Sequence, residues 1–188
     1  MVFKMKINKK KLAFAMCGSF CNIKNALNQL KKIKNKYNIL PIISFNVAKI
    51  NTRFGKAEDL IKKLEEICGK KVIDSIEGAE PIGPKNMADM LTVCPCTGNT
   101  LAKIVNAITD TPVTMAVKSM LRVEKPIIIC FASNDGLGAS AQNLAKARNT
   151  KNIYFVPLEK DDPINKPNSL VADFSKLSEI LKSCENIS

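Results

Sequence analysis

The segment CPCTGNT, residues 94–100, places two thiols, two hydroxyls and an asparagine within seven positions. Residues of these types could form a metal site, a redox-active thiol pair, or a turn whose hydroxyl and backbone N–H groups hold an anion. Cysteines at 94 and 96, and at 17 and 21, do not have the common zinc-binding spacings. A cysteine at a strand end is usually a small buried hydrophobe. We therefore expect no metal site and favour the anion-holding turn.

Three other segments share this chemistry, since each follows an apolar run with small, hydroxyl or amide side chains. Such residues also cap helices, so a single loop of this kind could serve capping alone. In a parallel α/β sheet, however, the loops after the strands meet at one edge, where ligands bind. We therefore predict one ligand site, built from Gly18, Ser19, Phe20, Ser44, Phe45, Asn46, Pro95, Thr97, Gly98, Asn99, Thr100, Ala132, Ser133 and Asn134.

The elements that position these loops are read from apolar runs and helical spacing. Strands are expected at 11–16, 38–44, 71–74, 88–94, 125–132 and 152–157, and helices at 22–37, 56–70, 100–108, 112–121, 136–149 and 175–184. This alternation predicts a single α/β domain over residues 1–188: a doubly wound, Rossmann-like (flavodoxin-like) three-layer sandwich with a mostly parallel six-stranded sheet. The proline-rich segment 157–169 is expected to be a long surface loop or lid.

The amino-acid composition argues against several classes of function. The chain has no histidine, which excludes histidine triads and imidazole metal ligands. The net charge is +12, and residues 1–57 hold 13 Lys and Arg with no acid, but no nucleic-acid motif accompanies this charge. We therefore expect no nucleic-acid partner, and at most a mildly anion-attracting first half. Seven cysteines, an odd number, favour reduced thiols and a cytoplasmic protein.

Membrane and nucleotide signatures are also missing from the sequence. No apolar run reaches the roughly 18 residues of a membrane-spanning helix, so no membrane association is expected. Neither G-x-x-x-x-G-K-[ST] nor G-x-G-x-x-G occurs. A P-loop enzyme or an ordinary dinucleotide dehydrogenase is therefore poorly supported.

The longer segment CPCTGNTLAKIVNAITDTPVTMAVKSML resembles the signature of the flavin-binding proteins related to phosphopantothenoylcysteine decarboxylase and flavin prenyltransferase. The resemblance implies FMN, with its phosphate at Ser19 and Ser44 and its ring edge near Asn134. It also implies that Thr97, Asn99 and Thr100 hold the ribityl chain or the ring edge. The chain departs from this pattern in two places. The decarboxylases use a histidine, which is absent here, and the prenyltransferases carry a glutamate where this chain has Asn134.

The segments NTRFGKAEDLIKKLEEICGKKVIDSIEGAEPIGPK and NTKNIYFVPLEKDDPINKPNSLVA are similar to the family of dipicolinate synthase B subunits of spore-forming bacteria. That resemblance implies an FMN-binding subunit that helps to oxidise a dihydrodipicolinate-type intermediate, in the cytoplasm of the mother cell. It also implies that the A subunit of the synthase is the partner and carries NAD(P), and that this chain forms a homo-oligomer. Arg53, Lys118 and Arg122 are the candidate cations for the dicarboxylate. Two alternatives stay open: a non-catalytic partner subunit, and a standalone FMN-dependent decarboxylase.

Overall fold

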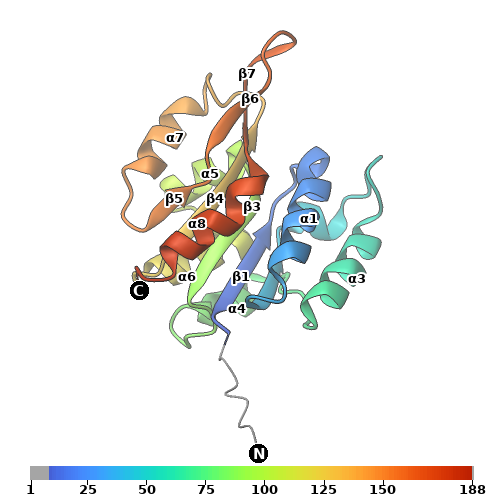
Figure 1. Ribbon diagram of the computed structural model, residues 1–188, viewed down its shortest axis with the longest axis vertical. Helices are drawn as coiled ribbons and strands as arrows, with labels where there is room; N and C mark the ends of the chain where they lie inside the picture. The colour runs from blue at the N-terminus through green and yellow to red at the C-terminus, as the bar shows by residue number, and fades with distance from the viewer. Residues whose placement is uncertain (1–8, 188) are drawn as a thin grey trace, which may run out of the picture.

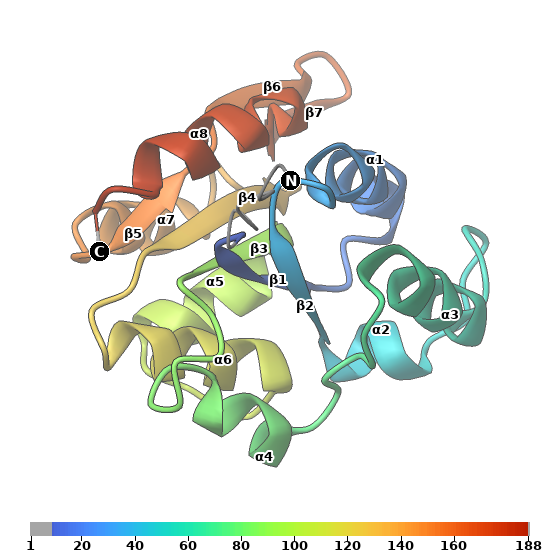
Figure 2. The same ribbon diagram turned by 60° about the horizontal axis from the view of Figure 1, so that its bottom comes forward.

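A seven-stranded sheet forms the middle layer of the molecule, with helices on both faces (Figures 1 and 2). The structure is a computed structural model that describes residues 9–187. The strands are β1 (Lys11–Met16), β2 (Asn38–Ile43), β3 (Met90–Thr97), β4 (Ile127–Ser133), β5 (Ile153–Phe155), β6 (Leu158–Asp162) and β7 (Lys166–Ala172). The α-helices are α1 (Ile23–Ile33), α2 (Phe45–Lys49), α3 (Ala57–Cys68), α4 (Ile76–Ala79), α5 (Gly98–Val105), α6 (Pro112–Leu121), α7 (Ala141–Arg148) and α8 (Leu177–Cys184).

The parallel part of the sheet has the order β2-β1-β3-β4-β5, so the predicted doubly wound sandwich is confirmed. Alternate side chains of β1 face opposite layers. Leu12, Phe14 and Met16 pack in one core with α1, α3 and α8, whereas Ala13 and Ala15 pack in the other with α4 to α7. The two cores fix the register of each strand, because a one-residue slip would turn every apolar side chain to the wrong layer.

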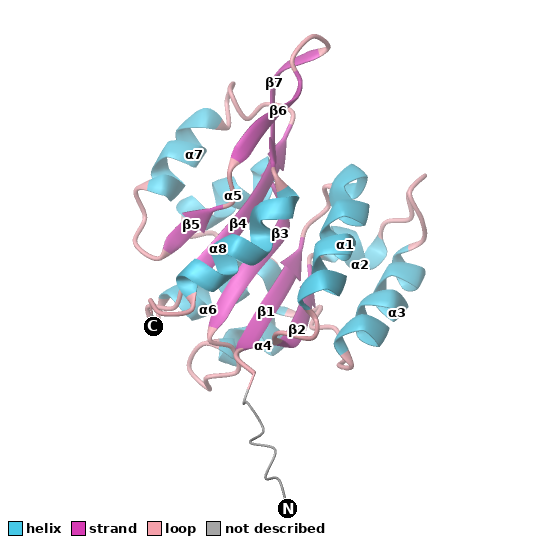
Figure 3. Cartoon of the chain, in the orientation of Figure 1, coloured by secondary structure: helices cyan, strands magenta, loops and turns pink. Residues whose placement is uncertain are grey.

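The prediction of six strands is wrong, because one predicted strand does not form and two others were not predicted. Residues 71–74 do not form a strand, and only Ile73 pairs, with Ile42, in an isolated bridge. The pairing stops there because Ser75 already caps α4. Residues 157–169 are not one long loop. They form most of an antiparallel hairpin, β6 and β7, which rises beyond the end of the parallel sheet (Figure 3).

The hairpin is attached to the sheet through β4. The first half of β4 pairs in parallel with β5, and its last residues, Ala132 and Ser133, pair antiparallel with Val171 and Leu170 of β7. Three prolines in 157–167 led to the expectation of a loop. They are tolerated because Pro157 precedes β6, Pro163 lies in the turn, and Pro167 is outside the pairing of β7 with β4.

Candidate functional site

A cleft of about 360 Å³ lies at the carboxyl ends of β1, β3 and β4, where the sheet meets the hairpin. This volume is in the range of about 300–1,000 Å³ that is typical of small-molecule sites. Its wall is built by the loops after the three strands and by one side of the hairpin. The lining residues are Gly18, Ser19, Phe20, Cys21, Asn22, Thr97, Gly98, Asn99, Ala132, Ser133, Asn134, Asp161, Lys166, Ser169, Leu170 and Val171.

The turn between β3 and α5 presents a helix start to the cleft. Thr97 is the N-cap: its Oγ1 accepts a hydrogen bond from Thr100 N at 3.1 Å and donates one to Thr100 Oγ1 at 3.0 Å. The N–H groups of Gly98 and Asn99 have no partner within the helix, because they belong to its first turn. Together with the helix dipole, they favour an anion or an electron-rich oxygen in the cleft.

The loop after β4 is held by a carboxylate. Ser133 and Ser140 donate hydrogen bonds to Asp135 Oδ1 at 2.5 and 2.9 Å. These bonds hold the pKa of the Asp135 carboxyl below its ordinary value, and the bond from Ser133 has the larger effect. Because the Ser133 hydroxyl hydrogen is used in this bond, its oxygen can only accept from a ligand in the cleft.

The loop after β1 is tied to β3 and to its own helix. Cys17 N donates to Pro95 O at 3.1 Å, which joins the ends of the two strands. Ser19 Oγ accepts from Asn22 Nδ2 at 3.0 Å, so its hydroxyl hydrogen is available to a ligand. A Cβ on Gly18 would lie 3.4 Å from the Phe20 ring, which is an ordinary contact distance.

The hairpin contributes residues that the sequence analysis missed. Lys166 and Asp161 form an ion pair at 2.9 Å, which is the main reason that the pKa of Lys166 is raised. Ser169 Oγ donates to the carbonyl oxygen of Ser133 at 3.3 Å and joins the hairpin to the β4 loop. The prolines of the segment 157–169 indicated a loop, and its attachment to the distant strand β4 leaves no local pattern in the sequence.

Nine of the fourteen predicted cofactor residues line the cleft: Gly18, Ser19, Phe20, Thr97, Gly98, Asn99, Ala132, Ser133 and Asn134. Two others, Pro95 and Thr100, are buried and do not line it. The β2 loop does not reach the lining. Ser44 is buried as the N-cap of α2, accepting from Val47 N at 3.4 Å, while Phe45 is half-buried and Asn46 is exposed beside Gly18.

The three predicted substrate cations do not meet within one chain. Arg53 is exposed on the α2–α3 loop, with its guanidinium 4.9 Å from the centre of the Phe54 ring. Lys118 and Arg122 lie on the last turn of α6 and just after it. Arg122 is only five residues before the start of β4, whose other end reaches the cleft. The structure therefore separates Lys118 and Arg122 from the cleft by the length of a strand.

The cysteines next to the cleft are buried thiols. Cys17, Cys94 and Cys96 have exposed fractions of 1% or less. Burial raises the pKa of Cys17 to about 11 and also raises the pKa values of Cys94 and Cys96. At neutral pH these thiols are protonated and therefore poor nucleophiles. In residues 9–187, no group of three or more potential ligand side chains is arranged to hold a metal ion.

Comparison with known proteins agrees with this geometry. The family model described as "Flavoprotein" matches residues 3–185. This chain belongs to the Flavoprotein family. Within the family it is a homologue of the dipicolinate synthase B subunit: it is 40% identical to that protein of Bacillus subtilis (strain 168), over 92% of this chain and 87% of the relative.

Solved structures support the same family and fold. The crystal structure of the dipicolinate synthase B subunit from Bacillus halodurans has a TM-score of 0.85 and 36% identity, over 94% of this chain and 91% of that one. The FMN-dependent cysteine decarboxylase SpaF has a TM-score of 0.69 at 20% identity, over 94% of this chain and 98% of that one, and shares the fold. No helix in the described part of the chain has both the length and the apolar character needed to span a bilayer.

Proposed function

We propose that this chain binds FMN in the cleft and acts with the A subunit of dipicolinate synthase to oxidise a dihydrodipicolinate-type intermediate to dipicolinate. The observation that carries the proposal is the convergence of Ser19, Thr97 and Asn134 from three strand ends on one cavity, in a chain that belongs to the Flavoprotein family. The 40% identity to a dipicolinate synthase B subunit supports the reaction and the partner.

The cleft has the chemistry that a phosphorylated flavin requires. The N–H groups of Gly98 and Asn99 and the hydroxyl of Ser19 are donors for phosphate or ribityl oxygens. Among residues 9–187, the side chains of Asn99 and Asn134 form no hydrogen bond with the rest of the protein, so both amides are available to a ligand. Within the same described range, Lys166 is the one cation among the lining residues.

Bound FMN would supply the hydride acceptor for an oxidation. The role of the protein is then to orient the cofactor and to keep water away from it. Thr97 and Asp135 hold the two loops that flank the cleft, and Leu170 and Val171 give the hairpin side an apolar surface. NAD(P) would be held by the A subunit, and a homo-oligomer of this chain is part of the same proposal.

A non-catalytic role next to the A subunit remains the second candidate, because one observation favours it. The ionisable side chains that line the cleft are Cys21, Asp161 and Lys166, and the last two are paired with each other. None of them is placed as a free general base. The histidine of the decarboxylases is absent, so we do not propose a standalone decarboxylase.

Reconstitution with the A subunit of the same organism tests the proposal. Dipicolinate formation would be measured for the A subunit without this chain, for the two proteins together, and for the two with added FMN. We expect full activity only when the chain and FMN are both present. Full activity in the absence of this chain would contradict a catalytic role. Activity that needs the chain but not FMN would favour the non-catalytic role.

A further inference from the structure

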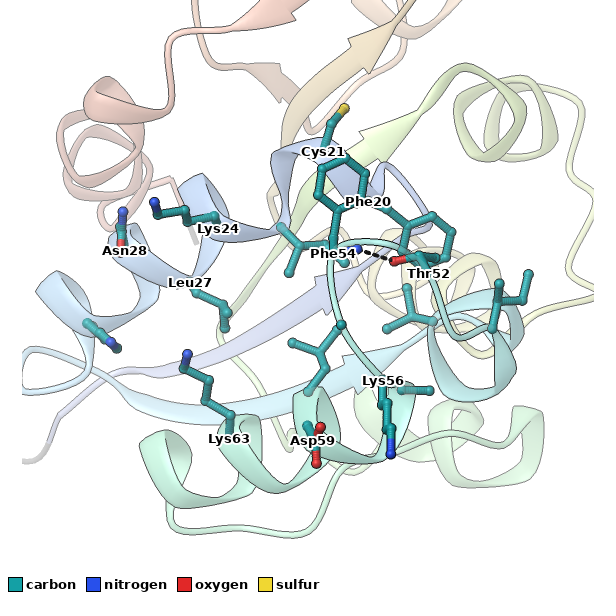
Figure 4. A pocket seen from close by; sticks show the side chains of 17 residues that line it. Phe20, Cys21, Lys24, Leu27, Asn28, Thr52, Phe54, Lys56, Asp59 and Lys63 are labelled. Carbon is teal, nitrogen blue, oxygen red and sulfur yellow. Dashed lines mark hydrogen bonds between the residues drawn. The ribbon is translucent and has the colours of Figure 1, made fainter.

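A second and larger cavity, of about 580 Å³, lies between α1 and α3 and adjoins the cleft. Phe20 and Cys21 line both cavities, so a ligand in the second would lie next to a ligand in the first. Figure 4 shows Lys24 and Leu27 on the α1 side, Asp59 and Lys63 on the α3 side, and Phe20 and Cys21 at one end.

The two helices present matching stripes to this cavity. On α1 the stripe is Lys24, Leu27 and Lys31, and on α3 it is Leu60 and Lys63, with Lys56 at the N-cap position just before that helix. Spacings of three, four and seven residues put each set on one helix face. The leucines therefore supply an apolar floor, and lysines stand on both sides of it.

The charge of the cavity is not balanced by the protein. Its lining holds four lysines and one carboxylate, Asp59. Among residues 9–187, none of these four lysines takes part in an ion pair, whereas the neighbouring Lys62 is paired with Glu58 at 2.6 Å. These four exposed lysines make the cavity electropositive, which favours an anion there.

The apolar part of the cavity also includes exposed aromatic surface. Phe54 is 55% exposed, although its ring lies on the cavity wall and stacks on Arg53. A planar ring could cover this surface and the leucine floor together. The complement of the cavity is thus a small molecule with a flat apolar body and more than one negative charge.

We infer that this second cavity binds the cyclic dicarboxylate on which the flavin acts. This inference rests on the proposed function and names the substrate site within it. The ring lies on Leu27 and Leu60, and the lysines of α1 and α3 bind the two carboxylates. The inference thus assigns substrate binding to Lys24, Lys31, Lys56 and Lys63, in place of the predicted Arg53, Lys118 and Arg122.

The test uses dipicolinate as the probe, because this stable aromatic molecule carries the same two carboxylates. Binding to the full chain would be measured by calorimetry in metal-free buffer at two salt concentrations. We expect saturable binding that weakens with salt, and a loss of about tenfold or more in affinity in K24Q/K63Q, since each lysine forms charge-assisted bonds. The matched control is K146Q/K182Q, which removes two exposed lysines elsewhere and should leave the affinity unchanged.

FMN titration of the same proteins separates this inference from the proposed function. K24Q/K63Q should bind FMN as the unmodified chain does. If FMN binds but dipicolinate does not, or if both double variants bind dipicolinate equally, the substrate site is wrong and the flavin site stands. If FMN does not bind the unmodified chain, the proposed function fails. If Phe54→Asp lowers the oligomer mass, a second copy covers the cavity and the inference is overturned.

Discussion

Gly98 and Ser133 lie so close together that a Cβ on Gly98 would be 2.6 Å from Ser133 Oγ. The closeness follows from the sheet, because Thr97 pairs with Ala132 and the next residue of each strand end comes side by side. Ser140 Oγ would be 2.9 Å from the same Cβ. Only glycine therefore allows the start of α5 to reach the floor of the cleft.

Gly98→Ala should destabilise the protein by about 1–3 kcal/mol, despite the better helix propensity of alanine. Both serine hydroxyls are bonded to Asp135, so moving them away breaks existing hydrogen bonds. Urea unfolding measures the change. Gly138→Ala is the control, since its Cβ would be 3.5 Å from Asp135 O, an ordinary contact. Equal stability of the two variants would contradict the close packing.

The ion pair of the hairpin should modulate the affinity for an anionic cofactor. Lys166→Gln removes the lining cation and should weaken FMN binding, whereas Asp161→Asn frees that cation and should strengthen it. Because the pair is solvent-exposed, each change should be within about fivefold. Both effects should disappear at high salt. Changes of the same sign in the two variants would show that the hairpin acts by shape and not by charge.

The acid sensitivity of the β4 loop depends on Asp135. Its folded pKa lies below the ordinary 3.8, so it stabilises the fold above that pH, and the stabilisation is lost as the pH falls further. Since Asp135 is exposed, we expect a contribution below about 1 kcal/mol. Asp135→Asn should lower the urea midpoint at pH 7. At about pH 3 the midpoints of the variant and the unmodified protein should be similar. An equal difference at both pH values would exclude this linkage.

The cysteines should differ sharply in reactivity. Cys21 is exposed and Cys68 is partly buried, with its pKa raised to about 11 by burial, while Cys17, Cys94, Cys96, Cys130 and Cys184 are buried. A thiol reagent at pH 8 should therefore modify Cys21 rapidly and Cys68 slowly, and reach all seven only in denaturant. Rapid reaction of three or more thiols in the native protein would contradict the burial of the strand-end cysteines.

The sequence was sufficient to predict elements that are marked by local signals, such as helix caps and apolar runs. Helix α6 spans Pro112–Leu121 as predicted. Its start could be predicted because Thr111 is an N-cap residue and Pro112 occupies the first helical position. The three loops that line the cleft were predicted by the polar residues that end each apolar run. The hairpin was not predicted, because Pro157, Pro163 and Pro167 indicated a loop, and because its attachment to β4 is a contact distant in sequence that no local pattern reports. Ser44 caps α2, and the sequence could not separate capping from ligand binding because both use the same side chain.

The central claim is that the cleft binds FMN, and an equilibrium titration of the purified chain with FMN tests it most directly. We expect saturable binding of one FMN per chain, with a change in flavin absorbance. Thr97→Val, which removes the hydroxyl that caps α5 at the cleft, should weaken this binding, whereas Thr97→Ser should retain it. An unchanged flavin spectrum at saturating protein, or equal affinity of Thr97→Val and the unmodified chain, would contradict it.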